Sequence, residues 1–206
     1  MSSESAKKIK QLAFYDTLTG LPNRRLFRDR LDRAFDSSGR SGREGALLYI
    51  DLDNFRDIND TLGRDIGDLL LQQAALRLQS CMRKGDTVAR LGGDEFMMML
   101  EDLSEQPVKA ATETKAMGEK ILATLNQPYQ LATHEYHSTV SIGAAIFSDH
   151  RESGEELLKR ADIAMYQAKQ AGRNTLKFFN PKMQDIINVR ATLESDLHKA
   201  LENRQF

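Results

Sequence analysis

Strand-like and helix-like segments alternate along the chain. Residues 46–50 form a continuously apolar run, which predicts a strand that is buried on both faces and ends at Asp51. Residues 66–82 and 108–125 carry apolar side chains near helical spacing, and Pro128 stops the second segment. This alternation favours an α/β or α+β fold, in which helices cover a sheet.

A hairpin with an acidic tip is predicted at residues 88–100. Two short apolar strands flank Gly92-Gly93-Asp94-Glu95, which has the composition of a tight turn. Asp51 and Asp53 stand two residues apart at the end of the first strand, so their side chains point to one side if the extended geometry continues that far. Pairing of the hairpin with this strand would gather several carboxylates at one edge of the sheet.

Such a cluster of carboxylates needs a compensating positive charge. Two carboxylates at about 4 Å repel by roughly 4 kcal/mol at an effective dielectric constant near 20. A divalent cation with oxygen ligands would offset this repulsion, and Mg²⁺ typically binds one or two carboxylates, several waters and substrate phosphates. Each motif alone is explained equally well by a strand end or an ordinary turn. Together they favour metal-assisted chemistry on a nucleoside triphosphate.

The second half of the chain continues the alternation. A strand is expected over residues 139–147, where apolar side chains alternate. A capping box at Ser153 and Glu156 opens a helix that ends at Gly172. After the folded region, Asn180-Pro181 breaks the chain, and a charged, helix-prone extension follows.

Composition and charge exclude several classes of protein. The 206 residues suit one domain with appendages, since domains average roughly 150 residues. Lys and Arg number 29 against 30 Asp and Glu, so no global positive field attracts nucleic acid or an anionic membrane. The single cysteine excludes an intrachain disulfide, and no run of about 18 apolar residues occurs. A cytoplasmic location without membrane insertion is expected, although the parent protein could be membrane-anchored.

Five ordered motifs give the chain a family resemblance. Residues 92–96 spell GGDEF, and residues 51–60, 16–24, 67–68 and 161–174 match further segments of the same family. The chain therefore resembles a diguanylate cyclase domain. The resemblance implies an α+β fold with a palm-like, mostly antiparallel sheet flanked by helices, related to nucleotide cyclases and polymerase palms.

The resemblance also implies a reaction. Two GTP molecules would condense to cyclic di-GMP with release of two pyrophosphates, in the presence of Mg²⁺ or Mn²⁺. Each domain of such an enzyme holds one GTP, so a second copy of the domain must face the first. The main alternative, of a different class, is a GTP-binding regulatory module that tunes a fused cyclic di-GMP phosphodiesterase, and a pure dimerisation domain is a third.

Roles for individual residues follow from the resemblance. Asp94 and Glu95 would be the catalytic pair, with Asp94 assisting deprotonation of the 3′-hydroxyl. Both would bind the metal together with Asp51 and the backbone carbonyl of Leu52. Substrate contacts are implied for a second set of positions: guanine would be bound by Asn59 and Asp68, the phosphates by Phe55, Arg56, Lys169 and Arg173, with close backbone approach at Gly92 and Gly93. Arg64 departs from the family pattern, in which a histidine is frequent at this position.

Two further segments match parts of the family. Arg83 and Asp86 stand where an inhibitory site for the cyclic di-GMP product occurs, although a surface ion pair explains them almost as well. Residues 190–201 are similar to the connector that precedes a phosphodiesterase EAL domain. We therefore expect a linker helix over residues 1–14, the GGDEF domain over 15–180, and a connector over 181–206, with sensory and EAL domains fused on either side.

Overall fold

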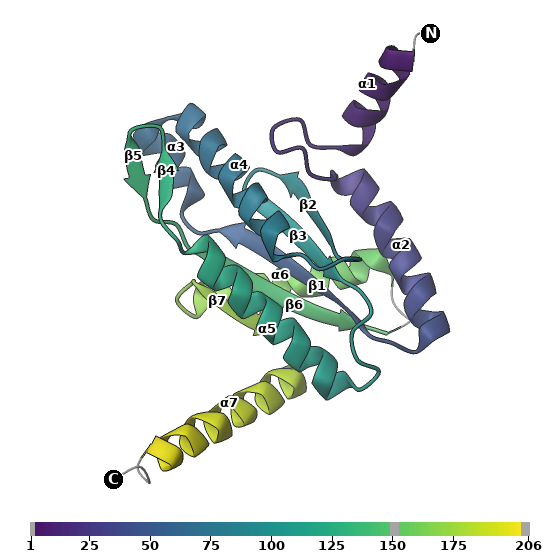
Figure 1. The fold of residues 1–206 in the computed structure, drawn as a ribbon, viewed down its shortest axis with the longest axis vertical. Helices are drawn as coiled ribbons and strands as arrows, with labels where there is room; N and C mark the ends of the chain where they lie inside the picture. The colour runs from purple at the N-terminus through teal and green to yellow at the C-terminus, as the bar shows by residue number, and fades with distance from the viewer. Residues whose placement is uncertain (1–2, 149–152, 203–206) are drawn as a thin grey trace.

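The computed structural model describes residues 3–148 and 153–202 and has a five-stranded central sheet (Figure 1). The strand order is β2-β3-β1-β6-β7, and every neighbouring pair is antiparallel except β6 and β7. The strands are β1 (Gly45–Leu52), β2 (Thr87–Gly92), β3 (Glu95–Leu100), β6 (Val140–Phe147) and β7 (Thr175–Phe178). The predicted α+β fold with a mostly antiparallel sheet is confirmed.

Helices cover both faces of this sheet (Figure 1). Helices α4 and α5 pack on one face and α2 and α6 on the other, while α1 and α7 project from the body. The helices are α1 (Ser3–Phe14), α2 (Arg24–Ser41), α3 (Phe55–Leu62), α4 (Arg64–Cys81), α5 (Pro107–Leu125), α6 (Gly154–Gln170) and α7 (Pro181–Glu202), and a small hairpin joins β4 (Tyr129–Leu131) to β5 (His134–Tyr136).

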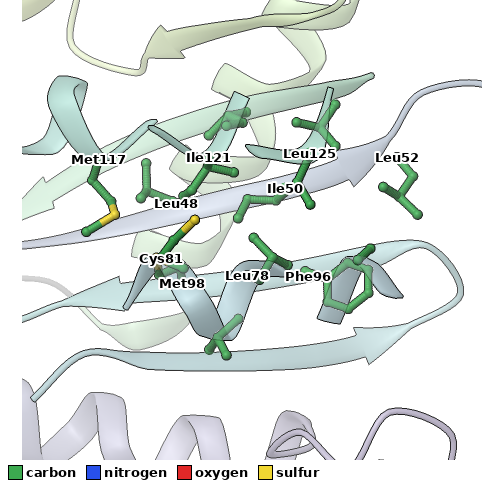
Figure 2. Packing of buried hydrophobic residues seen from close by; sticks show 14 of the residues in the cluster. Leu48, Ile50, Leu52, Leu78, Cys81, Phe96, Met98, Met117, Ile121 and Leu125 are labelled. Carbon is green, nitrogen blue, oxygen red and sulfur yellow. The ribbon is translucent and has the colours of Figure 1, made fainter. Parts of the chain in front are cut away.

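Strand β1 divides the core into two halves. Leu48 and Ile50 face α4 and α5, where they meet Leu78 and Ile121 (Figure 2). Alternate residues, including Tyr49, face α2 and α6. All eight residues of β1 are buried, which explains why its sequence is continuously apolar rather than alternating.

Helix α6 lies unusually close to β6 because Gly143 has no side chain. A Cβ at this position would lie 2.1 Å from the carbonyl oxygen of Ala161 and 2.1 Å from the amide nitrogen of Met165. The helix begins at the predicted cap, where the Ser153 hydroxyl accepts from the amide of Glu156 at 3.2 Å. Close contact at Gly143 fixes the distal end of α6, which carries Lys169, against the sheet.

The elements differ from the sequence predictions in several places. Strand β1 continues through Asp51 instead of ending there, because Asp51 retains ladder partners on both sides. Helix α7 begins at Pro181, which the first turn of a helix accommodates, rather than after it. Helices α2 and α3 and the β4–β5 hairpin were not predicted. No helix in the described parts of the chain combines the length and apolar content needed to span a bilayer.

Candidate active site

The end of β1 and the turn of the β2–β3 hairpin lie side by side. Asp51 is the ladder partner of Glu95, and the amide of Leu52 donates to the carbonyl of Asp94 at 3.3 Å. Two acidic segments far apart in sequence therefore share one edge of the sheet. The predicted pairing of the hairpin beside the first strand is confirmed.

Asp51 is a buried carboxylate at this edge. Its residue is 5% exposed, and its Oδ1 atom lies 2.7 Å from Nζ of Lys169, in an ion pair whose alignment falls outside hydrogen-bond geometry. Burial raises the pKa of Asp51 to about 6; contact with Lys169 opposes the rise, and the Asp94 and Glu95 carboxylates add to it. One ammonium group thus partly compensates three neighbouring carboxylates.

Tyr49 lies on the same face of the sheet, two residues before Asp51. Burial raises the pKa of its hydroxyl, and the neighbouring Glu95 carboxylate raises it further. Tyr49 and Glu95 therefore act on each other electrostatically beside Asp51.

Asp53 is engaged in hydrogen bonds within the fold, whereas the sequence analysis placed it in the acidic cluster. Its carboxylate accepts from the hydroxyls of Thr139 at 2.6 Å and Ser141 at 2.7 Å, and from the amide of Asn174 at 3.1 Å. The residue is 3% exposed. Asp53 joins β1 to β6 and to the loop after α6, and it is not among the carboxylates that shift the pKa of Asp51.

The glycine turn is held from outside by an arginine that sequence reasoning missed. Arg90 donates to the carbonyl of Gly93 from Nε at 2.9 Å and from Nη2 at 2.7 Å, and its Nη1 lies 3.0 Å from Asp16. Burial works against ionisation of Asp16, but bonds from Thr19 and Arg90 prevail and lower its pKa. The detectable signal was a single positive charge in an otherwise apolar strand. Gly92 and Gly93 have φ of 143° and 51°, which favour glycine.

The acidic edge fits a Mg²⁺ ion that shares its shell with a ligand. In the described residues, no three Asp, Glu, His or Cys side chains converge to hold a metal alone. Mg²⁺ does not require such a cage, since it typically retains waters and substrate phosphates beside one or two carboxylates. Asp51, with a buried oxygen and two carboxylates nearby, offers a suitable anchor, and Leu52, Asp94 and Glu95 adjoin it.

The predicted guanine contacts come from two packed helices. Asn59 on α3 lies against α4, because a Cβ on Gly67 would stand 1.9 Å from its Oδ1 atom. Asp68, the next residue of α4, is exposed. The structure therefore places Asn59 at the α3–α4 contact and Asp68 on the exposed surface of α4 beside it.

The predicted phosphate contacts are only partly assembled. Asn54 precedes α3 with φ of 58°, and its side chain does not cap the helix. Its backbone carbonyl accepts from the amide of Asp57 at 3.0 Å. The Arg56 side chain is 92% exposed. Arg173 is exposed in a left-handed loop after α6, whereas Lys169 contacts Asp51. Arg64 is exposed at the start of α4.

Arg83 and Asp86 form a local pair before β2. The buried Asp86 carboxylate accepts from the Arg83 amide at 2.9 Å and lies 3.6 Å from Nε of Arg83. Thr87, which follows, pairs with Met99, so this turn lies at the opposite end of the hairpin from Gly93. A product site here stays a prediction, and the Asp86 carboxylate already has a partner.

Known proteins are similar to this chain in sequence and in fold. The family model described as "Diguanylate cyclase, GGDEF domain" matches residues 13–175. The bifunctional diguanylate cyclase/cyclic di-GMP phosphodiesterase MucR of Pseudomonas aeruginosa is 42% identical over 97% of this chain, which spans 28% of that protein. The cyclic di-GMP phosphodiesterase PdeR of Escherichia coli is 34% identical over 97% of the chain, which spans 29% of its length.

A solved structure extends the comparison to the fold. The coiled coil and GGDEF domain of DgcB from Caulobacter crescentus, crystallised with c-di-GMP, superposes with a TM-score of 0.76 and 29% identity. The superposition covers 85% of this chain and 90% of that one. With the family model covering more than half of its residues, the chain belongs to the GGDEF, or diguanylate cyclase, domain family.

Proposed function

We propose that this domain is a Mg²⁺-dependent diguanylate cyclase, which condenses two GTP molecules to cyclic di-GMP across a pair of facing copies. The observation that carries the proposal is the ladder pairing of Asp51 with Glu95. This pairing brings Asp51, Asp94 and Glu95 together at one edge of the sheet. Family membership and the DgcB complex with c-di-GMP support the substrate class.

The chain's own residues divide the work. Asp68 would accept from N1–H and N2–H₂ of guanine with Asn59 beside it, a pattern of donors that adenine lacks. Lys169, Arg173, Arg56 and the amides of the first turn of α3 would hold the phosphates. Asp94 would take up the proton of the 3′-hydroxyl that attacks the α-phosphate of the other nucleotide.

Asp51, the carbonyl of Leu52, Asp94 and Glu95 would hold the metal, and Mn²⁺ would be an alternative ion. When bound, Mg²⁺ supplies charge neutralisation on the phosphates and lowers the cost of forming the attacking alkoxide. Arg90 holds the Gly93 carbonyl, which keeps the turn that carries Asp94 and Glu95 in place.

A product assay tests the proposal. The purified domain is incubated with GTP and Mg²⁺, and cyclic di-GMP is measured by liquid chromatography with mass detection. We expect two pyrophosphates per product and a rate per protomer that rises with protein concentration. Asp94→Asn should lower the rate by about 100-fold or more. Asp102→Asn is the control, since Asp102 is 78% exposed and has φ of 56°, which asparagine tolerates.

The alternative function is a GTP-binding regulator of a phosphodiesterase. One relative is named a phosphodiesterase, another is named bifunctional, and this chain spans less than a third of either. Fused sensory and EAL domains, with residues 1–14 and 181–206 as linkers, would suit this architecture. Saturable GTP binding without product, at protein concentrations where copies associate, would replace the cyclase proposal with this one.

A further inference from the structure

Two residues with different proposed ligands contact each other. Asp51 is proposed to hold the metal and Lys169 the phosphates, yet Nζ of Lys169 lies 2.7 Å from Oδ1 of Asp51. The Oδ1 atom has no accessible surface, so Lys169 occupies the approach to the most buried oxygen of the acidic edge. This inference rests on the proposed function and concerns what the ion pair does before any ligand binds.

The charges around Asp51 explain why a lysine is drawn to this position. Asp94 and Glu95 both act on the Asp51 carboxyl, and Lys169 is the cation that counters them. Removing Lys169 without replacement would leave a 7% exposed carboxylate beside two like charges. Without a metal ion the acidic edge needs another cation, and the chain supplies Lys169.

A metal ion and the ammonium group compete for this oxygen. Mg²⁺ binds carboxylate oxygens at about 2.0–2.1 Å, and its two positive charges would repel an ammonium group that remained in contact with the same atom. Entry of a metal thus requires departure of the lysine head group. Nucleotide phosphates offer that head group a new anionic partner.

The lysine can move without moving the helix that carries it. Its side chain is 30% exposed, whereas the preceding residue, Ala168, is fully buried. The close contact at Gly143 holds α6 on the sheet. Exchange of partners then needs only rotation about the bonds of one flexible side chain, which takes place rapidly at partly exposed sites.

We propose that Lys169 holds the place of the divalent cation on Asp51 in the nucleotide-free domain and transfers to the phosphates when nucleotide and metal bind. The domain consequently has low affinity for the metal alone. Nucleotide binding raises metal affinity in two ways, by adding phosphate ligands and by drawing Lys169 away. By thermodynamic linkage, the metal raises nucleotide affinity by the same factor.

The test measures metal binding without any turnover. Mn²⁺ serves as the probe, and its free concentration is followed by electron paramagnetic resonance in the absence of nucleotide. Lys169→Met keeps the length of the side chain and removes the charge; it should bind Mn²⁺ about tenfold or more tightly than wild type, within the usual range for coupled sites. Lys169→Gln should do the same, which provides a second neutral variant if the first does not fold.

Matched variants exclude a general effect of charge. Lys159→Met removes one positive charge from an exposed position on the same helix and should leave Mn²⁺ affinity unchanged. Asp51→Asn added to Lys169→Met should abolish the gain. A non-hydrolysable GTP analogue should tighten Mn²⁺ binding more in wild type than in Lys169→Met.

Several outcomes would overturn the inference. These are equal Mn²⁺ affinities of wild type and both Lys169 variants without nucleotide, an equal gain in Lys159→Met, and an equal response of wild type and Lys169→Met to the analogue. Tighter Mn²⁺ binding by Lys169→Met in a domain that forms no cyclic di-GMP would retire the cyclase proposal and leave this inference standing.

Discussion

Asp51 is a buried carboxyl group beside two other carboxylates, with one lysine to compensate it. Its pKa is raised from 3.8 to about 6, so the folded chain binds this proton more tightly than the unfolded chain does. The free energy of unfolding therefore falls as pH rises from about 4 to about 6, and the loss persists above pH 6. At neutral pH the ionised residue costs stability, by an amount on the order of 2 kcal/mol.

Asp51→Asn should consequently stabilise the metal-free protein at pH 7.5, by about 1–2 kcal/mol, and the gain should shrink toward pH 4. Urea unfolding in the presence of a chelator measures both values. Asp60→Asn is the control, because the Asp60 side chain is 70% exposed and should change stability by less than about 0.5 kcal/mol. A destabilised Asp51→Asn protein at pH 7.5 would contradict this account.

Arg90 shows how much depends on the shape of a single side chain. Its forked head group donates twice to the Gly93 carbonyl and also to both carboxylate oxygens of Asp16, and a lysine has a single head-group nitrogen. Arg90→Lys should lower the free energy of unfolding by about 1–2 kcal/mol and should be coupled to Asp16→Asn in a double-mutant cycle.

The matched control for this variant is Arg43→Lys. Arg43 also donates to a carbonyl and pairs with a carboxylate, both belonging to Asp102, but its side chain is 43% exposed against 11% for Arg90. We expect a smaller loss for Arg43→Lys, since exposed pairs contribute little. Equal losses would show that burial of the Arg90 fork adds nothing.

Helices α3 and α4 are in close contact at Gly67, where an added Cβ would lie 1.9 Å from Oδ1 of Asn59. Gly67 lets the Asn59 amide lie directly against α4, and alanine there would force that amide to shift. Gly67→Ala should therefore weaken GTP binding by about tenfold while unfolding stability stays within about 1 kcal/mol, because alanine is the better helix former. Calorimetric titration with GTP and thermal unfolding separate the two effects.

Gly154→Ala is the control for Gly67→Ala, because it also adds a methyl group to a helix. Its added Cβ would meet Leu31 at 3.2 Å, in the core and away from the predicted guanine contacts. GTP affinity should be unchanged in this protein. Loss of GTP binding in both variants would mean that the Gly67 effect is not local to Asn59.

Elements with a strong pattern were the ones that the sequence made predictable. Strand β1 is buried on both faces and is marked by a continuous apolar run, whereas α4 and α5 bury residues at helical spacing. Helix α2 also places buried residues at helical spacing, but charged side chains separate them, and it gains its stability from the core beneath the sheet. Hairpin β4–β5 has only three residues in each strand, too few for a period to emerge.

The parts of the site that depend on local sequence patterns were predictable, and the parts that depend on contacts between distant segments were not. Ladder pairing of Asp51 with Glu95 followed from two local patterns and a hairpin. Asp53 is hydrogen-bonded to Thr139 and Ser141, and Asp16 is paired with Arg90. These contacts join segments that meet only in the folded chain. No local sequence signal distinguishes a carboxylate that is free for a ligand from one that is already hydrogen-bonded.

At the scale of the whole molecule, α1 and α7 stand apart from a compact body (Figure 1). Helix α7 exposes an apolar stripe at Val189, Leu193 and Leu197, each at least 60% exposed. Its first turn is different, because the side chain of Gln184 accepts from the amide of Phe178 at 2.9 Å. The body therefore ends within the first turns of α7.

A chain that stops after Asp185 should keep the fold of the domain. We expect its midpoint of thermal unfolding to lie within about 3 °C of the full chain, since the apolar side chains of Val189, Leu193 and Leu197 are exposed. Circular dichroism during heating measures the change. A fall of about 10 °C or more would show that the outer part of α7 belongs to the cooperative unit.

The loop after α6 and the end of β1 are joined by one side chain, Asp53, which accepts from the amide of Asn174 while bonded to Thr139 and Ser141. The fold itself thus sets the spacing between the loop that carries Arg173 and the strand end that carries Asp51. A phosphate that bound there, as proposed, would meet a loop already held by Asp53, so association would lose little conformational entropy. Preorganisation of this kind shifts the remaining cost of binding onto desolvation and onto the ligand.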